Sequence, residues 1–481
     1  MKKDINAGWA LLTFVIMIIA MLITVVVLKQ SPHVPLIVGT TVAAIVAKMH
    51  GFKWIEIEEM MYKGIRLALP AIVIIILVGL TIGAWIGGGV VATMIYFGLK
   101  LISPAWFLVT IMLLCAIVSL AIGSSWSTMA TIGVAGMGIG LSMGIPAAMI
   151  AGAVISGSYF GDKMSPLSDT TNLAAGLTGT DLFDHIKHML YTTIPALVIA
   201  IVVFGIMGRS FADISMKSES ILTTLKVMEE SFVISPWLLL VPVGVIVLVA
   251  KKVPAIPALI IGIISGFLLQ IFVQGGTPTM AVHALQEGFV ISTGNDMVDN
   301  LFNRGGLDSM MNTVSMTIVA MTFGGVLEYS GMLKALMNVI IKFAKSTGSL
   351  VASTIAACIT TNATCSEQYI SIVVPSRMFA NVYRERGLHS KNLSRALEDG
   401  GTLTSVFFPW NTCGVFILAT LGVGAMDYAP YAIINFLVPI ISIFYAYIGF
   451  AIVKLTPEEM EEAEKRKKEQ EINDAEMVMA D

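Results

Sequence analysis

Two carboxylates stand among hydroxyl groups in the stretch 157–172, which reads Gly-Ser-Tyr-Phe-Gly-Asp-Lys-Met-Ser-Pro-Leu-Ser-Asp-Thr-Thr-Asn. Asp162 and Asp169 lie there inside a long apolar region. Na+, like other hard cations, takes its ligands from carboxylate, carbonyl and hydroxyl oxygens. A carboxyl group shielded from water also favours its protonated form, so it can exchange a proton for a cation. The stretch therefore predicts an ion- or proton-binding site.

The same polar residues have structural alternatives. Asp162 either binds an ion or proton, or it pairs with Lys163 or caps a half-helix. Lys163 either neutralises an Asp when Na+ is absent, meets an anionic substrate, or forms a structural salt bridge. Hydroxyl groups of the region are further candidates. Ser156 is a candidate ion ligand. The candidate residues of a substrate cavity are Lys163, Ser158, Ser165 and Thr170.

Composition indicates what must position these residues. Of the 481 residues, 56% are hydrophobic and 13% are charged, against roughly 25% charged in soluble domains. Apolar runs near 20 residues recur from 9–28 onward, long enough to cross a hydrocarbon core of about 30 Å. Polar, non-helical backbone at membrane depth needs burial in protein or a watery cavity. The sequence thus predicts an all-α polytopic membrane protein with a broken helix over 146–178.

Several functional classes lack support in the sequence. The net charge is -3 and no long basic region occurs, so no nucleic-acid partner is expected. The four cysteines lie in apolar segments without CxxC spacing, which is typical of free packing thiols. The six histidines form no HExxH pattern, and no nucleophile–base pair stands out. We expect a protein that is not an enzyme and needs no cofactor, with Na+ and H+ as transported ions.

A second polar centre lies at 123–128, between two apolar arms over 104–142. Such a pattern describes either two full spans or one re-entrant hairpin. The hairpin is favoured because a serine-rich tip needs burial in protein. Ser124, Ser125 and Ser127 would supply hydroxyl ligands there, although small hydroxyl residues also serve tight helix packing.

The second half of the chain repeats this order. A hairpin is predicted over 348–380, and a broken helix over 392–424. Glu367 is the only carboxylate at the second tip and is a candidate proton carrier or cation ligand. Asp399 lies near the predicted midplane, before a Gly pair. Further candidates at this end are Thr361, Asn362 and Thr364 for the ion, and Asn411 and Thr412 as neutral ligands of the cavity.

An offset of 243 residues lays the two halves over one another, carrying Cys115 onto Cys358 and Gly157 onto Gly400. Each half is predicted to hold five spans, a hairpin and a broken helix, and the odd number inverts the second half. In the first half we also expect an interfacial helix at 50–66, separate from a span at 68–86. A short helix at 90–102 is expected to lie along the membrane surface.

The charge distribution supports one topology. With the N-terminus inside, 22 of the 29 Lys and Arg fall on the cytoplasmic side and six outside, which follows the positive-inside rule. Both termini are then cytoplasmic. The predicted organisation is a first transmembrane repeat at 1–208, an extracytoplasmic connection at 209–233, a second inverted repeat at 234–455 and a charged cytoplasmic tail at 456–481.

These pieces resemble the NhaC-type Na+/H+ antiporter family, within the ion transporter superfamily. The stretch 157–172 looks like that family's motif, and 123–128 and 398–401 also look family-like. The resemblance implies a carrier of the bacterial inner membrane, and sodium coupling. It also implies Na+ at hairpin tips and broken-helix loops. On that basis the hypothetical Na+ ligands are Asp162, Asp169, Ser124 and Ser127.

The predicted function is Na+/H+ antiport by alternating access, with an inward proton flow expelling Na+. The alternative is Na+-coupled transport or exchange of a small carboxylate of the malate or lactate type, or of an amino acid. A channel is disfavoured by two broken helices within one chain. The expected partners are Na+, H+, the lipid bilayer and, in the alternative, the organic substrate. The broader superfamily implies a homodimer.

Overall fold

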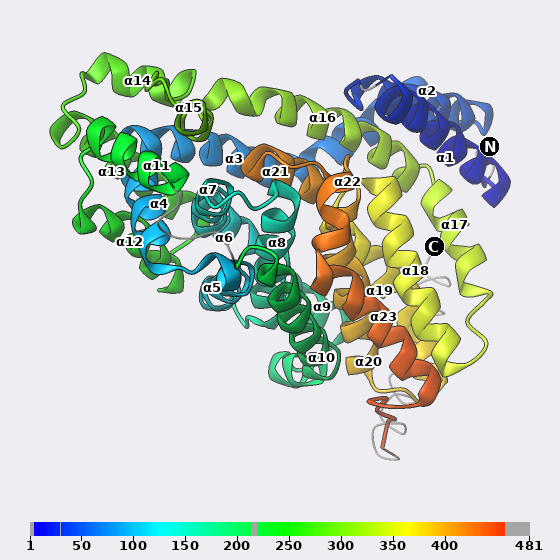
Figure 1. Ribbon diagram of the computed structural model, residues 1–481. Helices are drawn as coiled ribbons and strands as arrows, with labels where there is room; N and C mark the ends of the chain where they lie inside the picture. The colour runs from blue at the N-terminus through cyan, green and yellow to red at the C-terminus, as the bar shows by residue number, and fades with distance from the viewer. Residues whose placement is uncertain (1–3, 29, 213–218, 252, 457–481) are drawn as a thin grey trace.

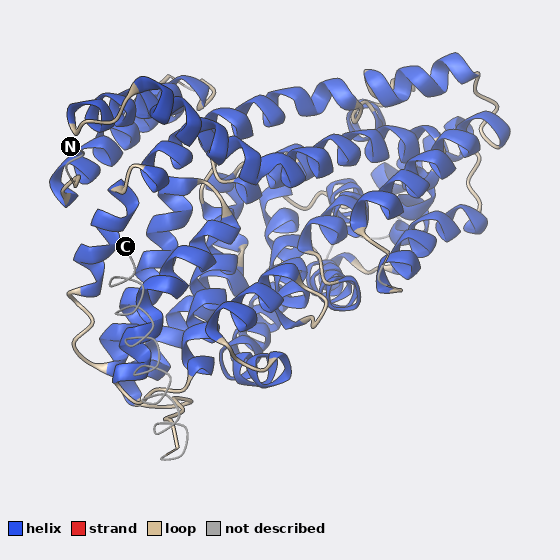
Figure 2. Cartoon of the chain, turned by 180° about the vertical axis from the view of Figure 1, so that it is seen from behind, coloured by secondary structure: helices blue, strands red, loops and turns tan. Residues whose placement is uncertain are grey.

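The computed structural model describes residues 4–28, 30–212, 219–251 and 253–456 (Figure 1). Helices account for most of this part of the chain, and it contains no β-strand, only two isolated bridges (Figure 2). The prediction of an all-α protein is confirmed. Residues 213–218 of the predicted connection and 457–481 of the predicted tail lie outside the described residues.

Several helices are long and apolar enough to cross a membrane. Within the described residues there are five such helices, or up to eight if each of three bent helix pairs is one span. The helices α2 (His33–Met49) and α13 (Ala255–Phe272) occupy two further predicted spans but are slightly shorter. Their composition supports a membrane protein.

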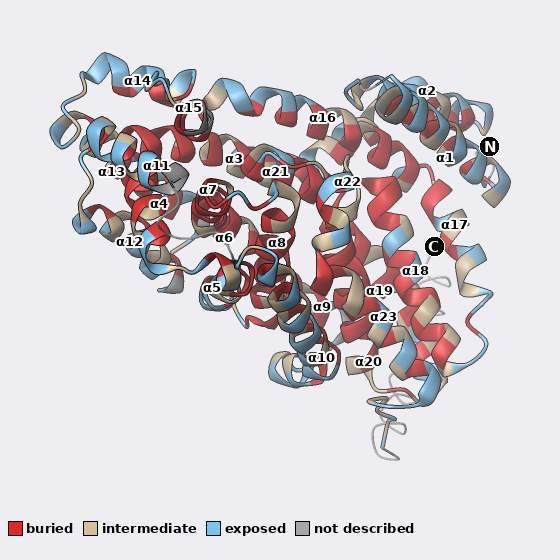
Figure 3. Ribbon diagram, viewed as in Figure 1, coloured by how far each residue is buried: buried red, intermediate tan, exposed pale blue. Residues whose placement is uncertain are grey.

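Exposure follows the same pattern, with buried residues along the central helices and exposed ones on outward faces (Figure 3). The outward faces carry large apolar side chains such as Val198, Leu268 and Phe444, which are 54%, 45% and 57% exposed. An apolar exterior of this kind suits contact with lipid. All four cysteines are buried and free.

Two long helices pack side by side along one edge of the molecule (Figure 1). They are α3 (Trp54–Gly87) and α16 (Leu307–Tyr329). Gly64 of α3 lies against Gly325, whereas Gly79 lies against Gly306 just before α16. The reversed order of these contacts means that the helices run antiparallel. Small residues allow the two backbones to approach closely.

The structure differs from the predicted arrangement at α3. The interfacial helix expected at 50–66 and the span expected at 68–86 form one continuous helix of 34 residues. No helix-terminating segment separates them, and Gly64 is retained because it packs against α16. The next helix, α4 (Val90–Leu101), forms where a helix was predicted. Most of its residues are buried, and it packs against α7 (Val134–Ser142). Its position along the membrane surface stays a prediction.

Both predicted polar tips interrupt a helix. In the first half, α5 (Phe107–Ile122) ends at Gly123, which has φ +73°, and α6 (Ser125–Thr128) continues through a π-helical turn into α7. In the second half, α18 (Thr347–Cys365) ends at Ser366, which has φ +58°, before α19 (Gln368–Glu385). Both residues adopt the left-handed region that reverses the chain direction.

Both predicted broken helices are interrupted where expected. α8 (Ala147–Met164) and α9 (Asp169–Thr178) are separated by residues 165–168. In the second half α20 (Ser390–Leu397) runs through a π-helical turn, Glu398–Thr402, and a 3-10 turn, Ser405–Phe407. α21 (Thr412–Leu421) follows at a bend of 50°.

Helix boundaries in the two halves agree at the offset of 243 residues. α8 spans 147–164 and the segment from α20 to the 3-10 turn spans 390–407, while α9 spans 169–178 and α21 spans 412–421. Contacts agree as well. A Cβ built on Gly157 would lie 3.0 Å from the Cys115 Cβ, and one built on Gly400 would lie 3.0 Å from the Cys358 Cβ. The first helix of each hairpin therefore packs in the same way on its broken helix.

The remaining helices complete the described chain. Their bounds are α1 Ala7–Met21, α10 Leu182–Arg209, α11 Glu219–Ser231, α12 Leu240–Ala250, α14 Pro278–Gln286, α15 Asp296–Phe302, α17 Met332–Ile341, α22 Ala425–Tyr428 and α23 Ile433–Ile448.

The glycine contact between α3 and α16 gives a testable prediction. Gly64→Ala should destabilise the protein by about 1–3 kcal/mol because of overpacking, since the new Cβ would lie 2.1 Å from the Met321 carbonyl oxygen. Gly244→Ala on α12 is the matched control, with no heavy atom within 4 Å of its Cβ. Thermal unfolding in detergent measures both. Equal melting temperatures for the two variants would contradict the contact.

Candidate functional site

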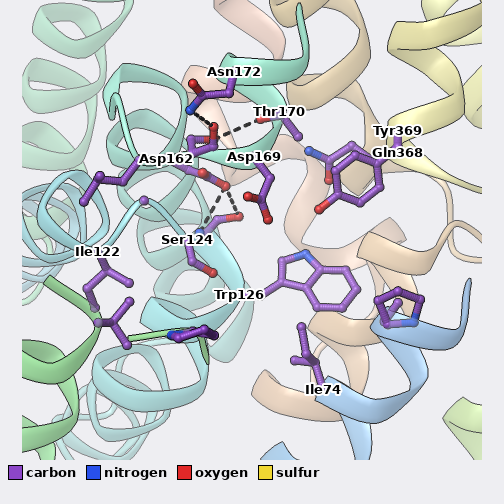
Figure 4. Close-up of a pocket in the computed structure, with 18 of the residues that line it drawn as sticks. Ile74, Ile122, Ser124, Trp126, Asp162, Asp169, Thr170, Asn172, Gln368 and Tyr369 are labelled. Carbon is purple, nitrogen blue, oxygen red and sulfur yellow. Dashed lines mark hydrogen bonds between the residues drawn. The ribbon is translucent and has the colours of Figure 1, made fainter. Parts of the chain in front are cut away.

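A cavity of about 880 Å³ lies where the two polar tips meet the first broken helix. The first tip contributes 122–126, the break between α8 and α9 contributes most of 162–172, and the second tip contributes 367–370. Apolar residues of α3 and of the α12–α13 connection close the remaining wall. Segments far apart in the sequence thus surround one space (Figure 4).

The charged residues described in the cavity wall are all acidic. Asp162, Asp169 and Glu367 line it, and the described lining residues include no Lys, Arg or His. Hydroxyl groups of Ser124, Ser125 and Thr170 and the amide of Gln368 add neutral oxygens to the wall. Such a wall attracts cations and offers several oxygen ligands to one.

Asp162 lies in the last turn of α8 and is only 7% exposed. One of its carboxylate oxygens accepts hydrogen bonds from the Ser125 backbone N–H at 3.1 Å and from the Ser125 hydroxyl at 2.6 Å. These bonds join the first tip to the first broken helix. The break that follows Asp162 is stabilised by Ser165, whose hydroxyl oxygen accepts from the Leu167 N–H at 3.2 Å.

Asp169 is the first residue of α9 and is exposed to the cavity. The positive end of the helix dipole favours a carboxylate at this position. Figure 4 shows the Asp162 and Asp169 carboxylates turned toward the same space, with Trp126 beside it. Ser124 also lines this space, and its hydroxyl oxygen accepts from the Ser127 N–H at 3.2 Å.

The structure therefore brings together three of the four hypothetical Na+ ligands. Ser127 is buried and does not line the cavity, whereas Ser125 does and hydrogen-bonds Asp162 directly. Ser127 is turned away because α6 begins at Ser125, and this helical turn places the next hydroxyl toward the protein interior.

Glu367 is the carboxylate of the second tip. Its side chain caps α19 by accepting from the backbone N–H groups of Tyr369 and Ile370. The hydroxyl group of Thr412 donates to its other oxygen at 3.5 Å. Glu367 therefore caps a helix and lines the cavity, and its predicted role as a proton carrier or cation ligand stays a prediction.

The other second-half candidates do not line the cavity. Asn362 donates to the Gly401 carbonyl at 2.7 Å, and Asn411 donates to the Asn362 backbone carbonyl at 3.1 Å. These bonds connect the second hairpin to the second broken helix. Thr361 and Thr364 hydrogen-bond carbonyls of their own helix. In the first half, Ser119 donates to the Ser158 carbonyl at 2.6 Å, which is the contact of Asn362 with Gly401 at the offset of 243 residues.

Lys163 and Asp399 form an ion pair behind the cavity. The Lys163 Nζ lies 2.6 Å from the Asp399 Oδ1, and both side chains are fully buried. The Thr192 hydroxyl donates to the same oxygen at 3.3 Å, and the Arg395 Nε lies 4.0 Å from Oδ2. The structure places Lys163 in the salt bridge that was one of its three sequence alternatives. Neither residue is part of the cavity wall.

The remaining hydroxyl candidates divide between wall and interior. Thr170 lines the cavity, and its hydroxyl lies 3.2 Å from that of Ser168. Ser156 and Ser158 are fully buried in α8 and do not line the cavity.

Sequence reasoning did not assign two features of the site. Trp126 stacks on Phe416 with ring centroids 4.2 Å apart and also lines the cavity. Glu398 is fully buried in the π-helical turn that also holds Asp399. The sequence signal for Glu398 was its position directly beside Asp399, as a second acidic residue in an apolar segment.

The chain is similar to several known proteins. A family model described as "Na+/H+ antiporter family" matches residues 157–450. A protein named Na+/H+ antiporter NhaC from Alkalihalophilus pseudofirmus is 41% identical over 455 residues, covering 94% of this chain and 98% of the relative. A Bacillus subtilis protein of the same name is 38% identical over 448 residues, covering 93% and 99%. A malate-2H+/Na+-lactate antiporter of Bacillus subtilis is 35% identical over 414 residues, covering 86% and 88%.

The buried ion pair gives a prediction about stability. Lys163→Met removes the closest cationic partner of the buried Asp399 carboxylate and leaves only the more distant Arg395, so it should destabilise the protein by about 3–5 kcal/mol. Adding Asp399→Asn removes that charge and should restore most of the lost stability. Thermal unfolding of the single and double variants in detergent measures the coupling. Additive losses in the double variant would mean that the two groups do not interact.

Proposed function

The chain belongs to the Na+/H+ antiporter family, and we propose that it exports Na+ in exchange for protons across the bacterial inner membrane. The observation that supports this function is the composition of the cavity wall. Asp162, Asp169 and Glu367 line it, and its described residues include no Lys, Arg or His. Oxygen ligands and uncompensated negative charge are what a small alkali cation requires.

The exchange follows from competition for the same negative charge. A protonated carboxyl group no longer attracts Na+, and bound Na+ disfavours protonation. One site that opens to each side in turn therefore carries Na+ in one direction and protons in the other. Asp162 is the central candidate because it joins the first tip to the broken helix and also lines the cavity.

A second candidate function is Na+-coupled transport or exchange of a small carboxylate or amino acid. The cavity volume of about 880 Å³ favours it, because a single Na+ needs far less room. The wall charge disfavours an anion, and the N-termini of α9 and α19 already carry the side-chain caps Ser168 and Glu367. Na+/H+ antiport is therefore the better supported function.

The proposed architecture behind alternating access is a pair of inverted repeats, 1–208 and 234–455. The equal helix boundaries and equivalent glycine contacts of the two halves support it. So does the antiparallel packing of α3 on α16, because related helices on opposite sides of an in-plane two-fold axis run in opposite directions. Both sequences around the tips are then re-entrant hairpins, although Pro104–Ile122 is by itself long enough to span.

The rest of the topology is part of the same proposal. The segment 209–233 connects the repeats outside the cytoplasm, and both termini, with the tail 456–481, are cytoplasmic. The Lys and Arg distribution supports this orientation. By resemblance to the broader superfamily, we add a homodimer to the proposal.

Asp162→Asn tests the proposed site. The variant should insert and fold, and its Na+-dependent proton movement in proteoliposomes should fall to the level of empty liposomes, because the central ligand has lost its charge. Asp184→Asn, at an exposed position in the first turn of α10, is the matched control and should transport like wild type. Wild-type activity of Asp162→Asn would remove Asp162 from the mechanism.

The same assay separates the two candidate functions. Na+-dependent proton movement without any organic solute supports antiport. If it is absent while Na+ drives uptake of labelled malate, lactate or amino acids, the second function holds.

Competition also sets the direction of the pH dependence. Protonation of the binding carboxylates increases as pH falls, so the apparent KM for Na+ should rise toward acid pH. One competing proton limits the rise to about tenfold per pH unit. Initial rates of Na+-dependent proton movement at several fixed pH values give this slope. A KM that does not change with pH would contradict competition.

A further inference from the structure

Five charged residues form a buried cluster behind the cavity. Asp162 and Lys163 belong to α8, Arg395 to α20, and Glu398 and Asp399 to the π-helical turn that follows α20. Asp162 is 7% exposed and the other four are fully buried. The cluster therefore spans the contact between the two broken helices, and only Asp162 reaches the cavity wall.

The charges of the cluster do not balance. Lys163 and Arg395 both approach Asp399, at 2.6 Å and 4.0 Å. Three carboxylates face two cationic groups, so the fully ionised cluster lacks one positive charge. An unbalanced charge away from water is costly. One additional monovalent cation restores neutrality, and a proton and Na+ satisfy this condition equally.

Glu398 and Asp162 differ in what they can bind. Asp162 borders the cavity among hydroxyl and carbonyl oxygens, so a Na+ ion has both room and ligands there. Glu398 is fully buried and lies outside the cavity wall, so a Na+ ion with its ligands has no room there. Glu398 lies close enough to Lys163 and Asp162 to interact with both electrostatically. A proton needs neither room nor a ligand shell, so Glu398 suits a proton.

Other titratable groups around the cluster do not supply the missing charge. Cys358 of α18 lies near Glu398, and Tyr383 of α19 and Tyr445 of α23 lie near Arg395. Thiol and phenol groups are ordinarily neutral near pH 7 and never positive. His185 of α10 faces Lys163, and a second positive charge there would be repelled by the ammonium group.

We propose that Glu398 is the proton-binding group of the exchange, separate from the Na+-binding carboxylate Asp162. The two sites exclude each other because the cluster accommodates one additional positive charge. When Na+ binds at Asp162, the O–H bond of Glu398 breaks, the electron pair stays on the carboxylate and the proton leaves to water. This assignment rests on the proposed Na+/H+ exchange and names the residue that carries its proton.

Glu398→Gln tests the assignment because the amide reproduces the protonated state permanently. Wild-type protein should show an apparent KM for Na+ that rises toward acid pH. The variant should show a KM that is independent of pH and equal to the wild-type value at the acid end. Near pH 8 the KM of the variant should therefore be tenfold or more above the wild-type KM. Transport of Na+ in proteoliposomes, with Na+ on both sides, measures KM without a proton gradient.

A second measurement does not depend on transport. Addition of Na+ to the purified protein in weakly buffered detergent solution should release protons from wild type and none from Glu398→Gln. Glu398→Asp keeps a carboxyl group and should release protons, which provides a folded comparison if the amide variant is unstable. Glu328→Gln is the matched control, because Glu328 lies in the last turn of α16, outside both the cavity and the cluster, and it should behave like wild type.

The outcomes separate the two levels of the proposal. Proton release and a pH-dependent KM in Glu398→Gln, with wild type showing both, would overturn the assignment of Glu398 and leave Na+/H+ exchange intact. Absence of both in wild type would overturn the exchange itself and the assignment with it. The proposal is supported if Glu398→Gln alone loses proton release and the pH dependence of KM, while Glu398→Asp and Glu328→Gln still release protons.

Discussion

The ion pair between Lys163 and Asp399 connects the two broken helices across 2.6 Å in a region without water-exposed surface. Its partners come from opposite halves of the chain, so neither half can bury its own charge independently. Around this pair the remaining polar groups are arranged in two zones. Carboxylates and hydroxyls face the cavity on one side, and Arg395 and Glu398 lie fully buried on the other. Everything proposed about ion exchange depends on that division.

Much of the fold could be predicted because its signals are local. Glycine, proline and hydroxyl residues mark the breaks at 165–168 and at both tips, and apolar runs on either side mark the helices. The position of Asp162, Asp169 and Glu367 at one cavity also follows from local sequence, since each stands at the polar centre of a broken element. The offset of 243 residues was visible in sparse identities, and the helix boundaries agree with it.

The rest depends on long-range geometry that a single sequence does not display. The partner of Lys163 lies 236 residues away, and three roles for this residue were equally open beforehand. Asn362 was predicted as an ion ligand and Asn411 as a neutral ligand of the cavity, and in the structure their amides connect two backbone segments. α3 was divided into two helices because a charged, amphipathic segment precedes an apolar one. Its continuity is explained by packing against α16, a neighbour that the sequence pattern does not identify.

The two tips reverse the chain with different residues, and this difference has an energetic consequence. Gly123 adopts its positive φ without steric cost, whereas Ser366 at φ +58° carries a Cβ that disfavours this conformation by about 1–2 kcal/mol. The Ser366 carbonyl accepts a hydrogen bond from the Thr412 N–H at 2.9 Å, which holds the turn against α21. Opening of that bond would release this strain at the second turn, whereas the first turn has none to release. The two tips therefore differ in the strain that they hold.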